Sequence, residues 1–226
     1  MWTVYIEMSL LHSLPPIVQI HATRRTDRAQ LTAAWTRQHG VHLDVFEAIM
    51  DKDGRRGCAL SHAAVAHRAA PYLVLEDDAI PTLHALTDIQ GVVDIQNALS
   101  SYDIIYLGGW PLGNSSSTFL SLHGGACLCT HAMIVGERAA RWLREFTFRG
   151  IPIDVALSRA PLRFAWTHHE WFSQAQCASD VNGNTVTTSK FFMASMQVVS
   201  RVWRMVMLHR FLCVALIVAL FIAWTK

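Results

Sequence analysis

The stretch Tyr72-Leu-Val-Leu-Glu-Asp-Asp78 (YLVLEDD) decides the fold class. Its first four residues are apolar without interruption and follow Pro71. A short continuous apolar run is typical of a strand that is buried on both faces, as in a parallel sheet. The run ends abruptly in Glu76, Asp77 and Asp78. We therefore predict a central strand of an α/β domain with three carboxylates at its carboxyl end.

Strand and helix patterns alternate around this stretch. Strands are predicted over Ile17–Ile20 and Val41–Ala48, and helices over Ala29–Gln38 and Cys58–Ala70. Downstream, the patterns indicate strands over Asp103–Leu107, Ala126–Thr130 and Ala132–Val135, helices over Glu137–Phe146 and from Pro152 to Ser158, and a polar, loop-like segment over His168–Thr188. This alternation predicts a three-layer α/β domain with a mostly parallel central sheet.

The two ends of the chain differ from this central part. Residues 1–16 read as an N-terminal extension, residues 17–190 as the α/β domain, and residues 191–226 as a linker followed by a hydrophobic helix. Fourteen consecutive apolar residues, Phe211–Trp224, form a helix of roughly 21 Å, against a bilayer core of ~30 Å. We expect a single-pass membrane anchor over residues of about 205–224, with a buried core helix as the alternative. Basic residues before the run favour a cytoplasmic main domain.

Composition excludes several classes of protein. The chain has 226 residues, of which 52% are hydrophobic and 16% charged, and its formal net charge is +2. These values argue against disorder, and the small net charge gives no reason to expect nucleic-acid binding. The five cysteines contain no Cys-x-x-Cys pair with histidine partners. We therefore expect buried free thiols, with Cys127 and Cys129 on one face of a strand, and no zinc site.

Charged residues that could bind a ligand follow two of the predicted strands. Ile20 leads into Arg24, Arg25, Asp27 and Arg28, and Leu75 leads into the three acids. Ligands of open α/β sheets bind outside the carboxyl ends of the strands. Adjacent carboxylates repel one another unless a cation neutralises them, and Mg²⁺ or Mn²⁺ bound to substrate phosphates would do so. Acids solvated in a turn are the alternative, and nucleases or phosphohydrolases use the same kind of cluster.

Several motifs in a fixed order sharpen this interpretation. They are RRTDR (Arg24–Arg28), GCALSH (Gly57–His62), YLVLEDD, DIIYLG (Asp103–Gly108), THAMIV (Thr130–Val135), PID (Pro152–Asp154) and Gln176 with Ser179-Asp180-Val181. Together they resemble glycosyltransferase family 25, the lipopolysaccharide and collagen-type sugar transferases of GT-A fold. The resemblance covers residues of about 17–182. His21 stands where the family has Asn, Met133 where it has Tyr, and Arg55-Arg56 where an acidic residue is usual.

The resemblance implies a nucleotide-sugar donor, usually a uridine diphosphate (UDP) sugar, and a divalent metal, Mn²⁺ or Mg²⁺. Metal ligands would be Glu76 and Asp78, the general base Asp154, and the donor-binding residues Arg25, Asp27, Arg28, Ser61, His62 and Asp77. Each has a structural alternative: a solvated helix start for Arg25–Arg28, a core position for His62, and a helix N-cap for Asp154.

The resulting expectation is a metal-dependent glycosyltransferase that moves a sugar, with inversion, to a hydroxyl of a glycan, lipid or protein. His168 or His169 would complete the metal shell, and three tryptophans, Trp110, Trp166 and Trp171, would offer sugar-stacking surfaces or pack in the core. The alternatives are a non-catalytic, membrane-anchored scaffold or binding protein, and a metal-dependent phosphohydrolase.

Overall fold

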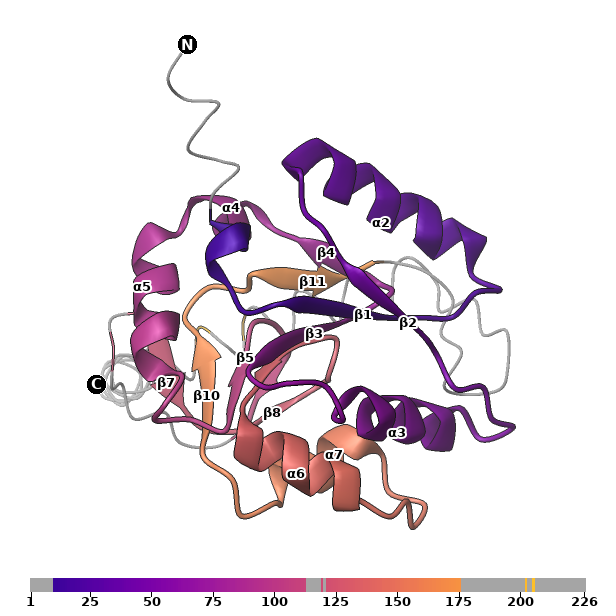
Figure 1. The fold of residues 1–226 in the computed structure, drawn as a ribbon. Coiled ribbons are helices and arrows are strands. Elements are labelled where there is room, and N and C mark those ends of the chain that lie inside the picture. Colours follow the sequence, from indigo (N-terminus) through magenta and orange to yellow (C-terminus); the bar gives the residue numbers. More distant parts are fainter. Residues whose placement is uncertain (1–9, 113–118, 120, 176–201, 203–204, 206–226) are drawn as a thin grey trace, which may run out of the picture.

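A central sheet organises the computed structural model of the chain, which describes residues 10–112, 119, 121–175, 202 and 205 (Figure 1). Its strand order is β2-β1-β3-β9-β5-β10-β7. The strands are β1 (Ile17–His21), β2 (Asp44–Glu47), β3 (Tyr72–Glu76), β5 (Ile104–Tyr106), β7 (Leu122–Gly124), β9 (Ala132–Val135) and β10 (Phe164–Thr167). Only β9 and β7 run against the other five. The sheet is therefore mostly parallel, as predicted.

Helices and two small sheets complete the described part. The helices are α2 (Thr26–His39), α3 (Gly54–Val65), α4 (Leu83–Thr87), α5 (Ile89–Ala98), α6 (Glu137–Glu145) and α7 (Ile153–Ser158), after the short 3₁₀ helix η1 (Leu11–Ser13). One small sheet pairs β4 (Ala79–Pro81) with β11 (Phe172–Gln174), and the other pairs β6 (Trp110–Pro111) with β8 (Cys127–Leu128).

The sheet separates two hydrophobic cores, which explains the unbroken apolar run of β3. Leu73 and Leu75 face a core that includes Trp35 of α2 and Ile95 of α5. Tyr72 and Val74 face a second core, made with α3, α6 and α7. Side chains alternate between the faces of a strand, so a strand covered by helices on both faces needs apolar residues at every position. Figure 1 shows these helix layers on either side of the sheet.

The connections of the first three strands bring the two charged strand ends together. The chain leaves β1 through α2 to reach β2, and then returns through α3 to β3, which pairs with the other edge of β1. Right-handed crossovers in opposite directions place their helices on opposite faces. The last pair in the β1–β3 register joins Ile20 to Glu76, so the RRTDR segment and the acidic group start side by side.

Several predicted boundaries differ from the observed ones. Helix α2 begins at Thr26, three residues before Ala29, because the turn after β1 is short. Helix α3 begins at Gly54, where the Asp53 side chain accepts a hydrogen bond from Arg55 N, and it ends at Val65. Helices α4 and α5 were not indicated by the pattern.

Two predicted features are wrong. Cys127 and Cys129 do not share a strand face, since β8 ends at Leu128 and Cys129 has a positive φ of 75°. The segment from His168 is not wholly loop-like, because β11 pairs with β4 there. The predicted hydrophobic helix, the Ser179-Asp180-Val181 motif and most of the N-terminal extension lie outside the described residues. Among the residues described, no helix is long and apolar enough to cross a membrane.

Candidate functional site

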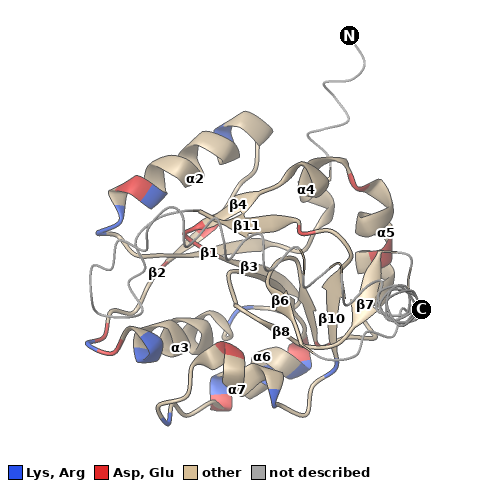
Figure 2. Cartoon of the chain, turned by 180° about the vertical axis from the view of Figure 1, so that it is seen from behind, with Lys and Arg blue, Asp and Glu red and all other residues tan. Residues whose placement is uncertain are grey.

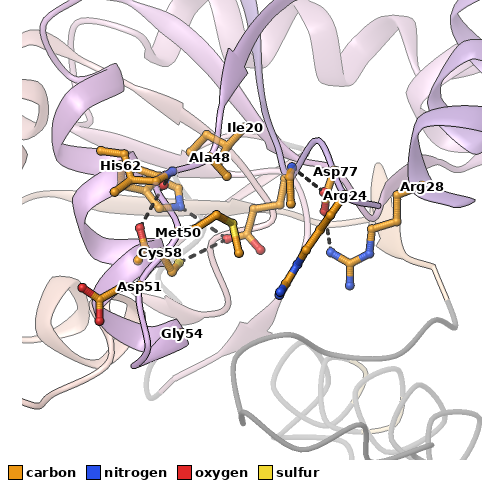
Figure 3. A pocket seen from close by; sticks show the side chains of 15 residues that line it. Ile20, Arg24, Arg28, Ala48, Met50, Asp51, Gly54, Cys58, His62 and Asp77 are labelled. Carbon is orange, nitrogen blue, oxygen red and sulfur yellow. Dashed lines mark hydrogen bonds and ion pairs between the residues drawn. The ribbon is translucent and has the colours of Figure 1, made fainter. Parts of the chain in front are cut away.

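An open pocket lies at the carboxyl ends of β1, β2 and β3. Its walls are Ile20, Ala22, Arg24 and Arg28 from β1 and the start of α2, Ala48–Asp51 after β2, Gly54, Gly57, Cys58, Ser61 and His62 from α3, and Glu76 with Asp77 after β3. Figure 3 shows Arg24, Arg28 and Asp77 on one side of it and Cys58 and His62 on the other.

Asp77 joins β3 to the segment after β1. Its Oδ1 pairs with Nη1 of Arg28, and its Oδ2 accepts a hydrogen bond of 2.9 Å from Ala22 N and lies 3.4 Å from Nδ1 of His21. The Asp77 and Arg28 side chains are both less than one-tenth exposed. Asp77 therefore holds the walls of the pocket together and orients Arg28.

Glu76 points toward α3. Its Oε1 accepts a hydrogen bond of 2.7 Å from the hydroxyl of Thr130 and lies 3.3 Å from Nε2 of His62 and 4.0 Å from Sγ of Cys58. Burial by itself would raise the pKa of Glu76, but the hydrogen bonds with His62 and Thr130 and the positive field of the histidines outweigh it. The net effect is a lowered pKa and an ionised carboxylate.

The pKa of Asp78 is raised, in contrast to that of Glu76. Burial, and then the negative charge of Glu76, raise its pKa from 3.8 to about 6, against the attraction of Arg28. Nη2 of Arg28 lies 3.3 Å from Oδ2 of Asp78, whereas Oδ1 is buried without a hydrogen-bond partner. A buried carboxylate oxygen without a donor is costly, so a partner is missing from this position.

The charges of Glu76 and Asp78 would suit a hard divalent ion, but Asp78 is not among the residues that line the pocket. The two carboxylates, which are 24% and 12% exposed, repel one another, and one oxygen of Asp78 has no hydrogen-bond partner. Mg²⁺ and Mn²⁺ prefer carboxylate oxygen ligands and would satisfy both conditions. Figure 2 shows this acidic edge of the sheet in the interior, between α2 and α3, while most other charged residues lie on helices and loops.

Ser61 and His62 line the pocket from α3, but their polar atoms already have partners. Ser61 Oγ accepts a hydrogen bond of 2.8 Å from Ile49 N and donates one of 2.9 Å to Gly57 O. A Cβ on Gly57 would lie 2.7 Å from Ile49 O, so this glycine permits α3 to approach the segment after β2. His62 is 2% exposed and faces Glu76. Their predicted contact with the donor stays a prediction.

Arg25 and Asp27 do not line the pocket. Nε and Nη2 of Arg25 donate hydrogen bonds of 2.9 and 2.7 Å to the two carboxylate oxygens of Asp27. The hydrogen bonds from Arg25 lower the pKa of Asp27, which is mainly exposed. Arg24 lines the pocket instead, beside Arg28. The donor-binding role of Arg25 and Asp27 stays a prediction.

Asp154, in the first turn of α7, lines a second, open cavity. One carboxylate oxygen accepts a hydrogen bond of 3.2 Å from Cys129 N, and the other accepts one of 2.8 Å from Val155 N. Cys58 and Glu76 belong to the walls of both cavities. Asp154, the predicted base, and Glu76, a predicted metal ligand, thus line one cavity. This cavity adjoins the first pocket, which we call the arginine-lined pocket after Arg24 and Arg28.

The other predicted contacts lie elsewhere or in the core. His168 Nδ1 is 3.1 Å from Nε2 of His123, and His169 stacks on His84 with ring centroids 4.1 Å apart. Trp166 and Trp171 are at most 1% exposed, which supports core packing for both. Trp110 is half-buried in β6.

Sequence reasoning missed part of the site. Arg24, Cys58, Thr130 and Gln174 line its walls, yet none was assigned a role. For Cys58 a signal existed, because Cys58 and His62 are four residues apart on a predicted helix and so share a face. Thr130 had no such signal, since β9 meets β3 only through the sheet pairing.

Comparisons with known proteins give distant structural similarity. No known protein family and no curated protein matches the sequence. The fold is similar to the crystal structure of HddC from Yersinia pseudotuberculosis, at 11% identity and a TM-score of 0.40 over 76% of this chain and 78% of that one. It is also similar to a glycosyltransferase involved in glycosylation of the major capsid of PBCV-1, at 14% identity and a TM-score of 0.34 over 65% and 69%.

Proposed function

We propose that this chain is a glycosyltransferase that moves a sugar from a nucleotide-sugar donor, a UDP-sugar first of all, to a hydroxyl acceptor. The observation that carries the proposal is the meeting of Arg24 and Arg28 with the carboxylates of Glu76 and Asp77 at one sheet edge, beside a cavity lined by Asp154. The ordered motifs that resemble glycosyltransferase family 25 supply the same residues, and a GT-A fold is part of this proposal.

The arginine-lined pocket would bind the donor. A guanidinium offers several donors in one plane and suits a diphosphate. Arg28 is fixed by Asp77, and the apolar surface of Ile20, Ala48 and Met50 would accommodate a base or ribose. Glu76 and Asp78 would hold Mn²⁺ or Mg²⁺, which neutralises charge on a leaving diphosphate.

Asp154 would act as the general base. The acceptor hydroxyl would give its proton to the carboxylate while its oxygen forms a bond to the anomeric carbon of the sugar. The bond from that carbon to the diphosphate oxygen breaks in the same step, so the configuration inverts. A positioned carboxylate contributes typically 10²–10⁴-fold to such a transfer.

Thermal unfolding with a panel of nucleotide sugars, with and without Mn²⁺, tests the proposal. A ligand that binds the folded state raises the melting temperature by mass action. We expect a UDP-sugar to stabilise the protein in a Mn²⁺-dependent way, and Asp78→Ala to lose this dependence. Glu137→Gln, a change at an exposed carboxylate, is the matched control.

The rival functions give different results. A phosphohydrolase would cleave simple phosphate esters with the metal and without any requirement for a sugar. A scaffold or binding protein would bind no nucleotide sugar at all. Stabilisation that is equal in the Asp78→Ala variant would contradict the metal site proposed for Glu76 and Asp78.

A further inference from the structure

A second kind of metal-ligating cluster stands in the wall between the two cavities. Cys58, His62 and Glu76 each present a ligand atom there, and the three atoms lie within 4.8 Å of one another. This cluster does not include Asp78, and it contains a thiol and an imidazole in place of a second carboxylate. The inference drawn from it goes beyond the proposed sugar transfer, and it assigns Glu76 to a second site that competes with Asp78 for this carboxylate.

The local fold produces this cluster. Cys58 and His62 are separated by four residues in α3, so their side chains project from the same face of the helix. Glu76 ends β3 and reaches α3 from the sheet. Thr130, at the start of the turn into β9, donates its hydroxyl to Oε1 of Glu76 and fixes the carboxylate.

The distances suit a small tetrahedral ion. Zinc bonds of 2.0–2.3 Å to nitrogen, oxygen and sulfur place neighbouring ligand atoms about 3.3–3.6 Å apart. The separation between His62 Nε2 and Glu76 Oε1 is 3.3 Å, and that between Cys58 Sγ and the same oxygen is 4.0 Å. The second separation is longer than this range, so binding would require the sulfur to move toward Glu76.

We propose that Cys58, His62 and Glu76 bind a borderline-soft divalent cation, Zn²⁺, with a fourth position open to the cavities on either side. Thiolate and imidazole ligands select Zn²⁺ over Mg²⁺, and three protein ligands with an open position are the pattern of zinc sites that bind a further ligand. The hydroxyl of Thr130 supports the carboxylate from outside the ligand set. This proposal departs from the expectation of no zinc site, which rested on Cys-x-x-Cys spacing alone.

Proton release is expected because the metal ligand is the thiolate. The sulfur of Cys58 would lose its proton when the Zn–S bond forms. Calorimetry in buffers of different ionisation enthalpy should therefore report protons released when Zn²⁺ binds.

The decisive test is spectroscopic and uses the full chain with a non-thiol reductant. We expect Co²⁺ to produce a sulfur-to-metal charge-transfer band in the near ultraviolet, and Zn²⁺ to abolish it. Cys58→Ser should lose the band. Cys129→Ser should retain the band, because Cys129 is not in the cluster. Cys129 is a matched control, since it lines the same cavity as Cys58 and burial raises its pKa to about 12. Asp78→Asn should also retain the band, which separates this site from the Glu76–Asp78 pair.

X-ray absorption at the zinc edge of the unmutated protein keeps the proposal testable if Cys58→Ser fails to fold. It should show one sulfur at about 2.3 Å and lighter ligands at about 2.0–2.1 Å. A shell of oxygen and nitrogen alone would overturn the proposal. So would a cobalt band that survives in Cys58→Ser or disappears in Cys129→Ser or Asp78→Asn.

Discussion

Arg28 of α2 and Asp77 at the end of β3 form a buried ion pair, with side chains that are 9% and 6% exposed. The pair joins the two charged strand ends that the β1–β3 register brings together. Asp77 also accepts a hydrogen bond from Ala22 N. Of the three acids in the EDD group, Asp77 is the one that joins β3 to the segment after β1.

Replacing the charge of Asp77 should destabilise the protein. Asp77→Asn can still accept from Ala22 N, but it leaves the buried guanidinium of Arg28 without its main counter-charge. Breaking a buried pair in this way costs about 3–5 kcal/mol. Urea unfolding measures the loss. Glu137→Gln, which breaks an exposed pair with Arg144, should change stability by less than about 1 kcal/mol, and an equally small effect of Asp77→Asn would contradict a stabilising role for the pair.

Neutralising Asp78 should have the opposite effect on the metal-free protein. Burial and the charge of Glu76 raise its pKa from 3.8 in the unfolded chain to about 6. The folded state therefore binds this proton more tightly, so the group favours folding below pH 4 and this contribution is lost as the pH rises to 6. In a chelator, Asp78→Asn should melt at a higher temperature than the unmutated protein at pH 7.5.

The same comparison at pH 4 supplies the control. Asp78 is then protonated in the folded state, and the advantage of asparagine should shrink or vanish. An advantage of equal size at both pH values would show that charge is not its cause. Added Mn²⁺ at pH 7.5 should stabilise the unmutated protein and leave Asp78→Asn unaffected, as expected for a residue that trades stability for ligand binding.

Arg24 and Arg25 form a matched pair for testing the pocket. Arg24 lines it, whereas Arg25 makes two hydrogen bonds to Asp27 outside it. Arg24→Ala should weaken binding of a UDP-sugar about tenfold, the effect of losing one charge-assisted hydrogen bond. Arg25→Ala should change the affinity by less than a factor of three. Calorimetric titration of both variants measures the difference, and the reverse order would restore the sequence-based assignment.

The contrast between these arginines shows what the sequence can predict here. Strand β3 and the position of its acids follow from local patterns, because an apolar run buried on both faces leaves few alternatives. Which arginine of RRTDR faces the pocket depends on backbone geometry after Ile20 and on the Arg25–Asp27 contact. The spacing of residues in the sequence predicts neither the backbone geometry nor this contact, since side chains in a turn have no fixed period.

Non-local contacts were likewise out of reach. Thr130 meets Glu76 only because β9 enters the sheet antiparallel between β3 and β5. The sequence predicted β9 as a strand but gave no direction for it. The wall shared by the two cavities, with Cys58 and Glu76 in it, is a consequence of the same tertiary arrangement.

A variant of Asp154 should change the rate of sugar transfer without changing the affinity for the donor. It lines the cavity beyond Glu76 and is not part of the arginine-lined pocket. Asp154→Asn keeps one oxygen, enough for only one of the two hydrogen bonds from Cys129 N and Val155 N, and it cannot take a proton. We expect the rate of sugar transfer to fall at least 10²-fold while the dissociation constant of the donor stays within a factor of about two. Steady-state kinetics together with donor titration tests this, because a general base affects kcat, whereas a purely structural cap would lower the melting temperature and leave kcat of the folded fraction unchanged.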